Sequence, residues 1–234
     1  MFMIFRLAIM MFFMTIVWGA PDLKAHTYQP SPRVYKGMDT LPKKPDSTQL
    51  QSALPQDIVF LLDISNSMAQ DKKMELLKRS MQSLLENLRP VDRVSLITFG
   101  NAVTLIYRTS SLTTPDSLMR IIEKMRSTAT ATNVNGAIDM AYDQLSETPR
   151  GKTRQEVFLV TDGEFKLVKR VIKAVQDQTW VRMTAVVVGK GESAEKAVIY
   201  VRDTLGLDVV TLVNEDKDAN NLLDHIRELN TAIK

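Results

Sequence analysis

The stretch DISNSM, which begins at Asp63, places one carboxylate and two hydroxyls at alternate positions directly after an apolar run. Asp63, Ser65 and Ser67 offer only oxygen atoms, and oxygen is the ligand that hard divalent cations such as Mg²⁺ prefer. Two more oxygen-bearing positions lie far along the chain: Thr132 within TATATNVNGAI, and Asp162 in Thr-Asp-Gly after another apolar run. Together these side chains predict a divalent metal site without imidazole or thiolate ligands.

Each part of this set also has an ordinary structural explanation. Asp63 or Ser67 can cap a following helix, and Thr132 can cap a later one. The pair Asp162-Gly163 alone can form a turn. The metal hypothesis requires three separate loops to converge, so it depends on the elements that carry them.

Short continuous apolar runs alternate along the chain with segments of helical periodicity. Runs without polar alternation are typical of strands covered on both faces, as in mostly parallel sheets. The helical segments carry apolar residues at steps of three and four. The predicted strands are 58–62, 94–99, 103–107, 157–161, 183–188 and 209–213, and the predicted helices are 74–88, 115–125, 138–145, 168–175, 197–205 and 222–233.

This order of elements predicts an α/β fold: a doubly wound, mostly parallel central sheet with helices on both faces. Gly100-Asn101 joins the second and third strands and is a two-residue hairpin signal, so the third strand is expected to be an antiparallel edge strand. Ligands of open α/β sheets bind beyond the carboxyl ends of the strands. Asp63 and Asp162 both follow such ends, so we expect them at one edge of the sheet.

The chain resembles the von Willebrand factor type A family, whose metal ion-dependent adhesion site has a defined pattern. The pattern is Asp-x-Ser-x-Ser after the first strand, a Thr in a later loop and an Asp after the fourth strand, and this chain matches all five positions. The similarity extends through LRPVDRVSLITFG from Leu88 and VVVGKG from Val186, and covers essentially residues 56–234. The chain is most similar to bacterial members.

The resemblance implies a role for each ligand. Ser65 and Ser67 would bind Mg²⁺ or Mn²⁺ directly, and Thr132 directly or through water. Asp63 and Asp162 would act largely through water and through hydrogen bonds to the serines. Because the inner ligands are neutral hydroxyls, the cation retains affinity for an outside carboxylate, and a Glu or Asp of a partner protein is the expected final ligand.

Asn66 is the one departure from the pattern, since bacterial relatives usually carry glycine there. If this position needs a positive φ, Asn is among the least costly replacements. In a metal-free site the two carboxylates are expected to repel each other, so replacing Asp63 by alanine could raise stability there. In family members the site can be coupled to the last helix, here about 218–233, but nothing in this sequence shows that coupling.

Two alternatives to metal-dependent binding remain. A strand-terminal Asp63 is similar to the nucleophile of haloacid dehalogenase-like phosphatases, but the general acid expected two residues later is replaced by Ser65. No base that would activate Ser65 or Ser67 is evident, so we predict that the chain is not an enzyme. The other alternative keeps the fold as a metal-indifferent scaffold in an envelope complex.

The 234 residues are enough for one sizeable domain with a leader and a linker. Residues 1–25 contain a short charged start, an apolar stretch and small residues, which predict a secretory signal peptide and export to the periplasm or the outside. An uncleaved N-terminal membrane anchor is the alternative. Residues 26–56 are rich in proline and are expected to be a linker, and 57–234 form the predicted domain.

Charge and cysteine content narrow the functional class. Residues 1–56 hold six Lys or Arg against three Asp or Glu, which accounts for the whole net charge of +3 and leaves a neutral domain. A neutral domain gives no electrostatic reason to expect nucleic acid as a partner. The absence of cysteine excludes disulfides and thiolate zinc sites, so the domain must gain its stability from an apolar core.

Overall fold

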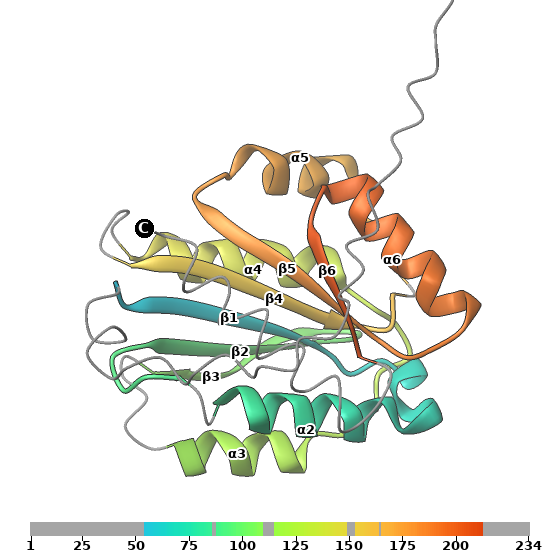
Figure 1. Ribbon diagram of the computed structural model, residues 1–234, viewed down its shortest axis with the longest axis horizontal. Coiled ribbons are helices and arrows are strands. Elements are labelled where there is room, and N and C mark those ends of the chain that lie inside the picture. The colour runs from blue at the N-terminus through green and yellow to red at the C-terminus, as the bar shows by residue number, and fades with distance from the viewer. Residues whose placement is uncertain (1–53, 86–87, 110–114, 149–152, 164, 213–234) are drawn as a thin grey trace, which may run out of the picture. The chain divides into compact units, whose positions relative to one another are not determined.

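The computed structural model describes residues 54–212 except 86–87, 110–114, 149–152 and 164, and shows a sheet covered by helices (Figure 1). The strands are β1 (Gln56–Asp63), β2 (Arg93–Phe99), β3 (Val103–Thr109), β4 (Arg154–Thr161), β5 (Val181–Val188) and β6 (Asp208–Leu212). The helices are the 3₁₀ helix η1 (Asn66–Lys72), α2 (Lys73–Leu85), α3 (Pro115–Lys124), α4 (Val134–Ser146), α5 (Lys169–Asp177) and α6 (Glu192–Leu205). The predicted helix 222–233 and the predicted leader and linker, apart from 54–56, lie outside these residues.

The six strands form one sheet in the order β3-β2-β1-β4-β5-β6. All neighbours are parallel except β2 and β3, which are antiparallel. The predicted α/β fold and the predicted antiparallel edge strand are therefore confirmed. The chain leaves β1 toward β2 and leaves β4 toward β5, in opposite directions along the sheet, so the junction of β1 and β4 is the switch point at which such sheets bind ligands.

Side chains of β1 divide alternately between two apolar layers, because successive residues of a strand face opposite sides of the sheet. Ile58, Phe60 and Leu62 pack with α2 and α3, whereas Val59 and Leu61 pack with α4, α5 and α6. Figure 1 shows α2 and α3 below the sheet and α4 and α5 above it. All of β1 is buried, which explains why its sequence shows an unbroken apolar run.

A 3₁₀ helix that the sequence did not indicate precedes α2. The apolar stripe indicated a helix from Met74, and α2 begins one residue earlier, at Lys73, directly after η1. Asp71 and Lys72, at the junction, have φ of 51° and 58°, in the left-handed region. A non-glycine residue there costs roughly 1–2 kcal/mol, so the chain holds two strained residues immediately before Lys73.

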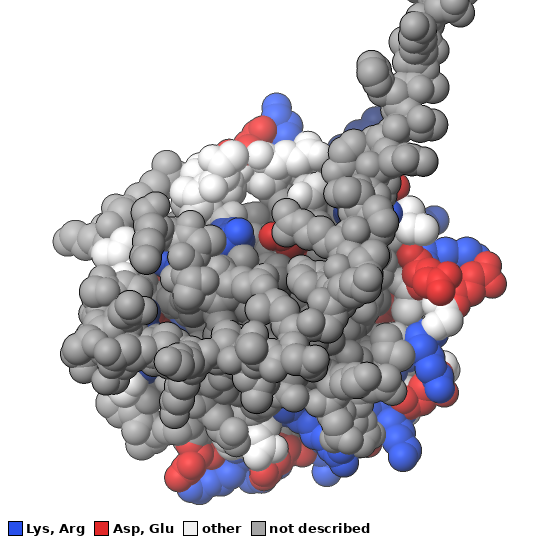
Figure 2. Space-filling view, viewed as in Figure 1, with Lys and Arg blue, Asp and Glu red and all other residues white. Residues whose placement is uncertain are grey.

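Charged side chains of both signs are interspersed over the described part of the face in Figure 2. This agrees with the neutral count for the domain.

Candidate metal site

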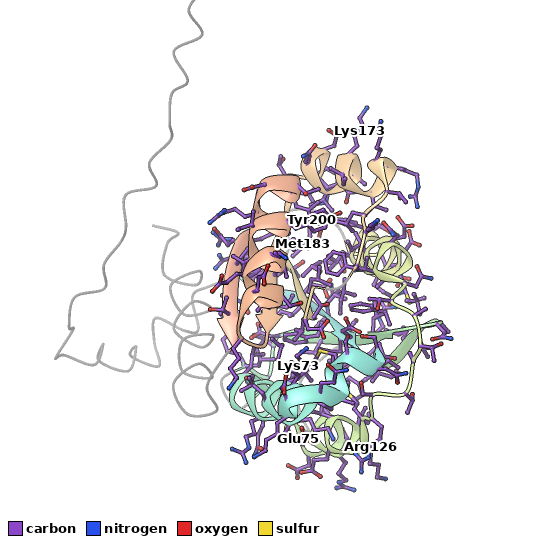
Figure 3. The ribbon with its side chains drawn as sticks, turned by 90° about the vertical axis from the view of Figure 1, so that its right-hand side faces the viewer. Lys73, Glu75, Arg126, Lys173, Met183 and Tyr200 are labelled. Carbon is purple, nitrogen blue, oxygen red and sulfur yellow. The ribbon has the colours of Figure 1, made fainter. Side chains whose placement is uncertain are left out.

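The loops after β1 and β4 leave the sheet side by side. β1 and β4 are parallel neighbours, with Leu62 opposite Val160. Asp63 is the last residue of β1 and Asp162 directly follows β4, so both lie at neighbouring strand ends. Figure 3 faces this edge of the sheet. The structure thus brings the two predicted carboxylates to one place.

The loop that carries Thr132 is joined to the loop after β1 by backbone hydrogen bonds. Asn66 N donates to the Ala129 carbonyl at 2.7 Å, and Ala129 N donates to the Ile64 carbonyl at 3.1 Å. Ser65 and Ala129 form an isolated parallel bridge. Because these contacts use main-chain atoms, the two loops form one rigid unit.

The tip of the β2–β3 hairpin also holds the loop that carries Thr132. A Cβ atom on Gly100 would lie 2.1 Å from Ala129 Cβ, so only glycine allows this approach. Ala131 N donates to Asn101 Oδ1 at 3.0 Å, and Asn133 N donates to the Gly100 carbonyl at 2.9 Å. The sequence identified Gly100-Asn101 only as a hairpin turn and missed its role in holding the threonine loop.

Asp63 is fully buried, and both carboxylate oxygens accept hydrogen bonds. Ser65 N donates to Oδ1 at 2.8 Å, and the Thr161 hydroxyl donates to Oδ2 at 2.7 Å. Burial raises the pKa of Asp63 above its ordinary value, while the hydrogen bonds from Ser65 and Thr161 oppose this rise and the nearby charge of Asp162 adds to it. Asp63 therefore ties the first loop to β4. Sequence reasoning missed Thr161 as its partner.

The hydroxyls of the two loops meet at an open hollow. Ser65 Oγ and Ser67 Oγ are 3.0 Å apart. The hollow has a volume of about 470 Å³, and its lining residues are Ser65, Asn66, Ser67, Gln70, Thr130, Ala131 and Thr132. Asp63 and Asp162 are not among them, since their exposed fractions are 0% and 3%. Three of the predicted ligands thus line the hollow, and the two carboxylates are buried.

Asp162 has one occupied and one unoccupied oxygen. Lys73 Nζ donates to Oδ2 at 2.9 Å, whereas Oδ1 is buried and has no hydrogen-bond partner among the described residues. A buried carboxylate oxygen without a donor is costly, and a divalent cation or its bound water would satisfy it. The residues present therefore fit such a cation. Lys73 was not foreseen from the sequence.

The backbone at Asn66 carries no left-handed strain. Among the described residues, the non-glycine residues with positive φ are Asp71 and Lys72. Asn66 therefore does not need a positive φ, and it causes no backbone strain in the loop. Its backbone N–H donates to the Ala129 carbonyl.

The segment after Asp162 is held by two helices. A Cβ atom on Gly163, whose φ is 89°, would lie 2.0 Å from Ala197 Cβ of α6. Tyr200 Oη of α6 accepts a hydrogen bond from Leu167 N at 2.9 Å, and the amide of Asn135 in α4 both donates to and accepts from the same segment. The third loop is therefore fixed by packing on both sides.

In the described part of the chain, no group of three or more Asp, Glu, His or Cys side chains is placed to hold a metal ion. None of the helices in that part is long and apolar enough to cross a membrane. The predicted leader lies outside it.

Comparison with known proteins identifies the family of the domain. The family model for the von Willebrand factor type A domain matches residues 57–230. The uncharacterized protein YfbK of Escherichia coli (strain K12) is 23% identical over 173 residues, which cover 71% of this chain and 29% of that protein. The chain therefore spans less than a third of the length of this curated relative.

Solved structures share the fold at low sequence identity. BatB from Bacteroides thetaiotaomicron, a conserved hypothetical protein, has a TM-score of 0.63 at 18% identity, covering 74% of this chain and 98% of that one. The manganese-loaded TRAP protein of Plasmodium vivax has a TM-score of 0.59 at 20% identity, covering 74% and 72% of the two chains.

Proposed function

The chain belongs to the von Willebrand factor type A family, and from this premise we propose that it is an exported, divalent-metal-dependent protein-binding module. A carboxylate from a partner protein would complete the metal's coordination. The residues proposed to hold Mg²⁺ or Mn²⁺ are Asp63, Ser65, Ser67, Thr132 and Asp162.

One observation carries the proposal: hydroxyls from two loops line one open hollow, and the third loop supplies a buried carboxylate with a free oxygen. Neutral hydroxyls leave the charge of a divalent cation largely uncompensated. When bound, the cation supplies an open coordination position that an outside carboxylate can take. The manganese-loaded TRAP protein, which shares the fold, supports a divalent metal as the occupant.

The chain's own residues have separate duties in this proposal. Ser65 and Ser67 offer oxygens at the mouth of the hollow, 3.0 Å from each other. Asp63, whose oxygens are both engaged by loop and strand donors, keeps Ser65 in position. The Pro-rich linker was predicted to end at residue 56, but Gln56 is the first residue of β1. The residues before it would hold the module away from the membrane or from another domain, as extended linkers do.

We do not propose catalysis. Ser65 Oγ lies 3.0 Å from Ser67 Oγ, and the Ser65 side chain also hydrogen-bonds Asp63. That carboxylate is already engaged by Ser65 N and the Thr161 hydroxyl, as expected of a group that positions the loop. The residue two positions after Asp63 is again Ser65, which has no pKa suited to a general acid. The proposal of export rests on the signal-peptide pattern in the sequence of residues 1–25.

The contact between Lys73 and Asp162 favours a second candidate function. This lysine neutralises one carboxylate without any metal, so the domain can be stable as a metal-indifferent scaffold in an envelope complex. The two candidates differ in one measurable property: only the first needs the metal for binding.

The test is metal-dependent capture of envelope proteins by the full chain. Wild type in Mg²⁺ should retain a partner that is lost in chelator, and Ser65→Ala should lose it in both buffers. Ser146→Ala is the matched control, because Ser146 lies at the last turn of α4 and its hydroxyl donates to the Asp143 carbonyl of the same helix, away from the candidate site. A wild-type partner that is retained equally in Mg²⁺ and chelator would establish the scaffold and refute the adhesion-site mechanism.

A further inference from the structure

Lys73 is the first residue of α2 and places a cation inside the candidate site. Its Nζ lies 2.9 Å from Asp162 Oδ2, and the exposed fractions of the two side chains are 13% and 3%. The two residues are 89 positions apart in the sequence. In Figure 3, Lys73 lies at the end of α2 nearest the edge where the parallel strands end.

The position of this lysine is fixed by packing as well as by charge. A Cβ atom on Gly189, which follows β5 with φ of 127°, would lie 3.3 Å from Lys73 Cε and 3.8 Å from its Cδ. The aliphatic part of Lys73 thus lies against the Gly189 backbone. The strained residues Asp71 and Lys72 precede it directly, and strain of this kind persists only where the surroundings enforce it.

The charge of the site follows from these contacts. Asp63 and Asp162 carry two negative charges, and Lys73 carries one positive charge. A divalent cation would bring the sum to +1, whereas without Lys73 the sum would be zero. Charges in partly buried sites interact strongly because little water screens them, so this single charge affects how tightly a cation binds.

We propose that Lys73 is a resident counter-cation of the site, which neutralises Asp162 in the metal-free protein and weakens the binding of divalent metal. High metal occupancy then requires the negative charge of a partner's carboxylate, so metal and partner bind cooperatively. The proposal rests on the proposed function and adds the regulation of the same site. A purely structural ion pair would stabilise the metal-free and metal-bound proteins equally.

The first test measures thermal unfolding of the full chain in chelator and across an Mn²⁺ titration. Lys73→Gln leaves a buried carboxylate unpaired, so its midpoint in chelator should fall below that of wild type. Mn²⁺ should then raise its midpoint by more than it raises the wild-type midpoint. We expect the Mn²⁺ dissociation constant to fall about tenfold, which corresponds to about 1.4 kcal/mol.

Two controls separate the role of Lys73 from general effects of charge and folding. Lys72→Gln makes the same change in net charge at the adjacent, exposed position and should leave the Mn²⁺ affinity within about twofold of wild type, because exposed charges are screened. Lys73→Arg keeps the cation and should also stay within about twofold, since one charge is retained at the same place. If Lys73→Gln does not fold, the test rests on Lys73→Arg. A Mn²⁺ dissociation constant of Lys73→Arg that is tenfold lower than that of wild type would overturn the proposal.

Acetate serves as the probe for the outside carboxylate. It should increase the Mn²⁺ affinity of wild type and should increase that of Lys73→Gln by a smaller factor. Equal Mn²⁺ affinities and equal midpoint gains for wild type and Lys73→Gln would overturn the counter-cation proposal and leave the proposed function standing. No response of wild type to Mn²⁺ would overturn the proposed function, and this inference with it.

Discussion

Replacement of Asp63 by alanine tests whether this carboxylate organises the site before any metal binds. The side chain is fully buried and accepts hydrogen bonds at 2.8 Å from Ser65 N and at 2.7 Å from the Thr161 hydroxyl, with a further one from the Ser65 side chain. A hydrogen bond to a charged group contributes about 1.5–3 kcal/mol. Burial of the charge opposes this, as the raised pKa of Asp63 indicates. We expect a net loss of about 3 kcal/mol in the free energy of unfolding.

The sequence alone suggested the opposite sign, because two carboxylates facing an empty site repel each other. The ion pair between Lys73 and Asp162 removes much of that repulsion, and the loss of these hydrogen bonds then dominates.

The assay is thermal unfolding of the full chain in chelator. A loss of about 3 kcal/mol should lower the midpoint of Asp63→Ala by about 10 °C for a domain of this size. Asp63→Asn keeps one acceptor for Ser65 N and should lose about 1 kcal/mol. Both variants should lose the response to Mn²⁺. A midpoint for Asp63→Ala equal to or above that of wild type in chelator would refute the assignment of Asp63 as the group that ties the first loop to β4.

Three further outcomes are expected. Mg²⁺ or Mn²⁺ at a hundred times its dissociation constant should stabilise wild type by about 2.7 kcal/mol. This corresponds to a rise of roughly 5–10 °C in the midpoint of thermal unfolding, and Ca²⁺ should have a smaller effect. A midpoint unchanged by Mg²⁺ and by Mn²⁺ would contradict the metal site. Gly100→Ala should cost about 1–3 kcal/mol of stability by overpacking and weaken Mn²⁺ binding, because its Cβ would lie 2.1 Å from Ala129 Cβ. Adding Ala129→Gly to the same chain should restore the stability and the Mn²⁺ affinity. If it does not, the contact is not the cause. Glu156 is 2% exposed, and burial raises the pKa of its carboxyl while Arg154 opposes the rise. The native state therefore binds this proton more tightly than the unfolded state does. Wild type should lose stability as pH rises from about 4.3 through the raised pKa. Glu156→Gln should remove this part of the pH dependence in chelator, and identical slopes for the two proteins would contradict it.

The fold and the candidate ligands were predictable because their signals are local. The apolar run before Asp63 indicated a strand buried on both faces, and Gly100-Asn101 indicated the antiparallel edge strand. Both are confirmed. The five metal-ligand positions were read from short motifs, and the structure brings their loops to one edge of the sheet, although the ligand set itself stays a prediction.

The partners of the two carboxylates were not predictable in the same way. Lys73 and Thr161 lie 89 and 98 residues from the carboxylates they bond. Hydrophobic periodicity says which face of an element is buried, but it does not say which polar side chains meet across loops. Lysine at the start of a helix is common on protein surfaces, so Lys73 gave no signal until the register of β1 and β4 was known.

The hydrogen bonds between the first and second loops use backbone atoms, as between Asn66 N and the Ala129 carbonyl. Asn66 and Gln70 are among the residues that line the hollow, yet these backbone hydrogen bonds do not depend on what their side chains are. Such rim positions can accept substitutions while the loops keep their course. If the domain binds partners as proposed, evolution or a combinatorial library built at these positions would be able to change the partner without rebuilding the loop framework beneath.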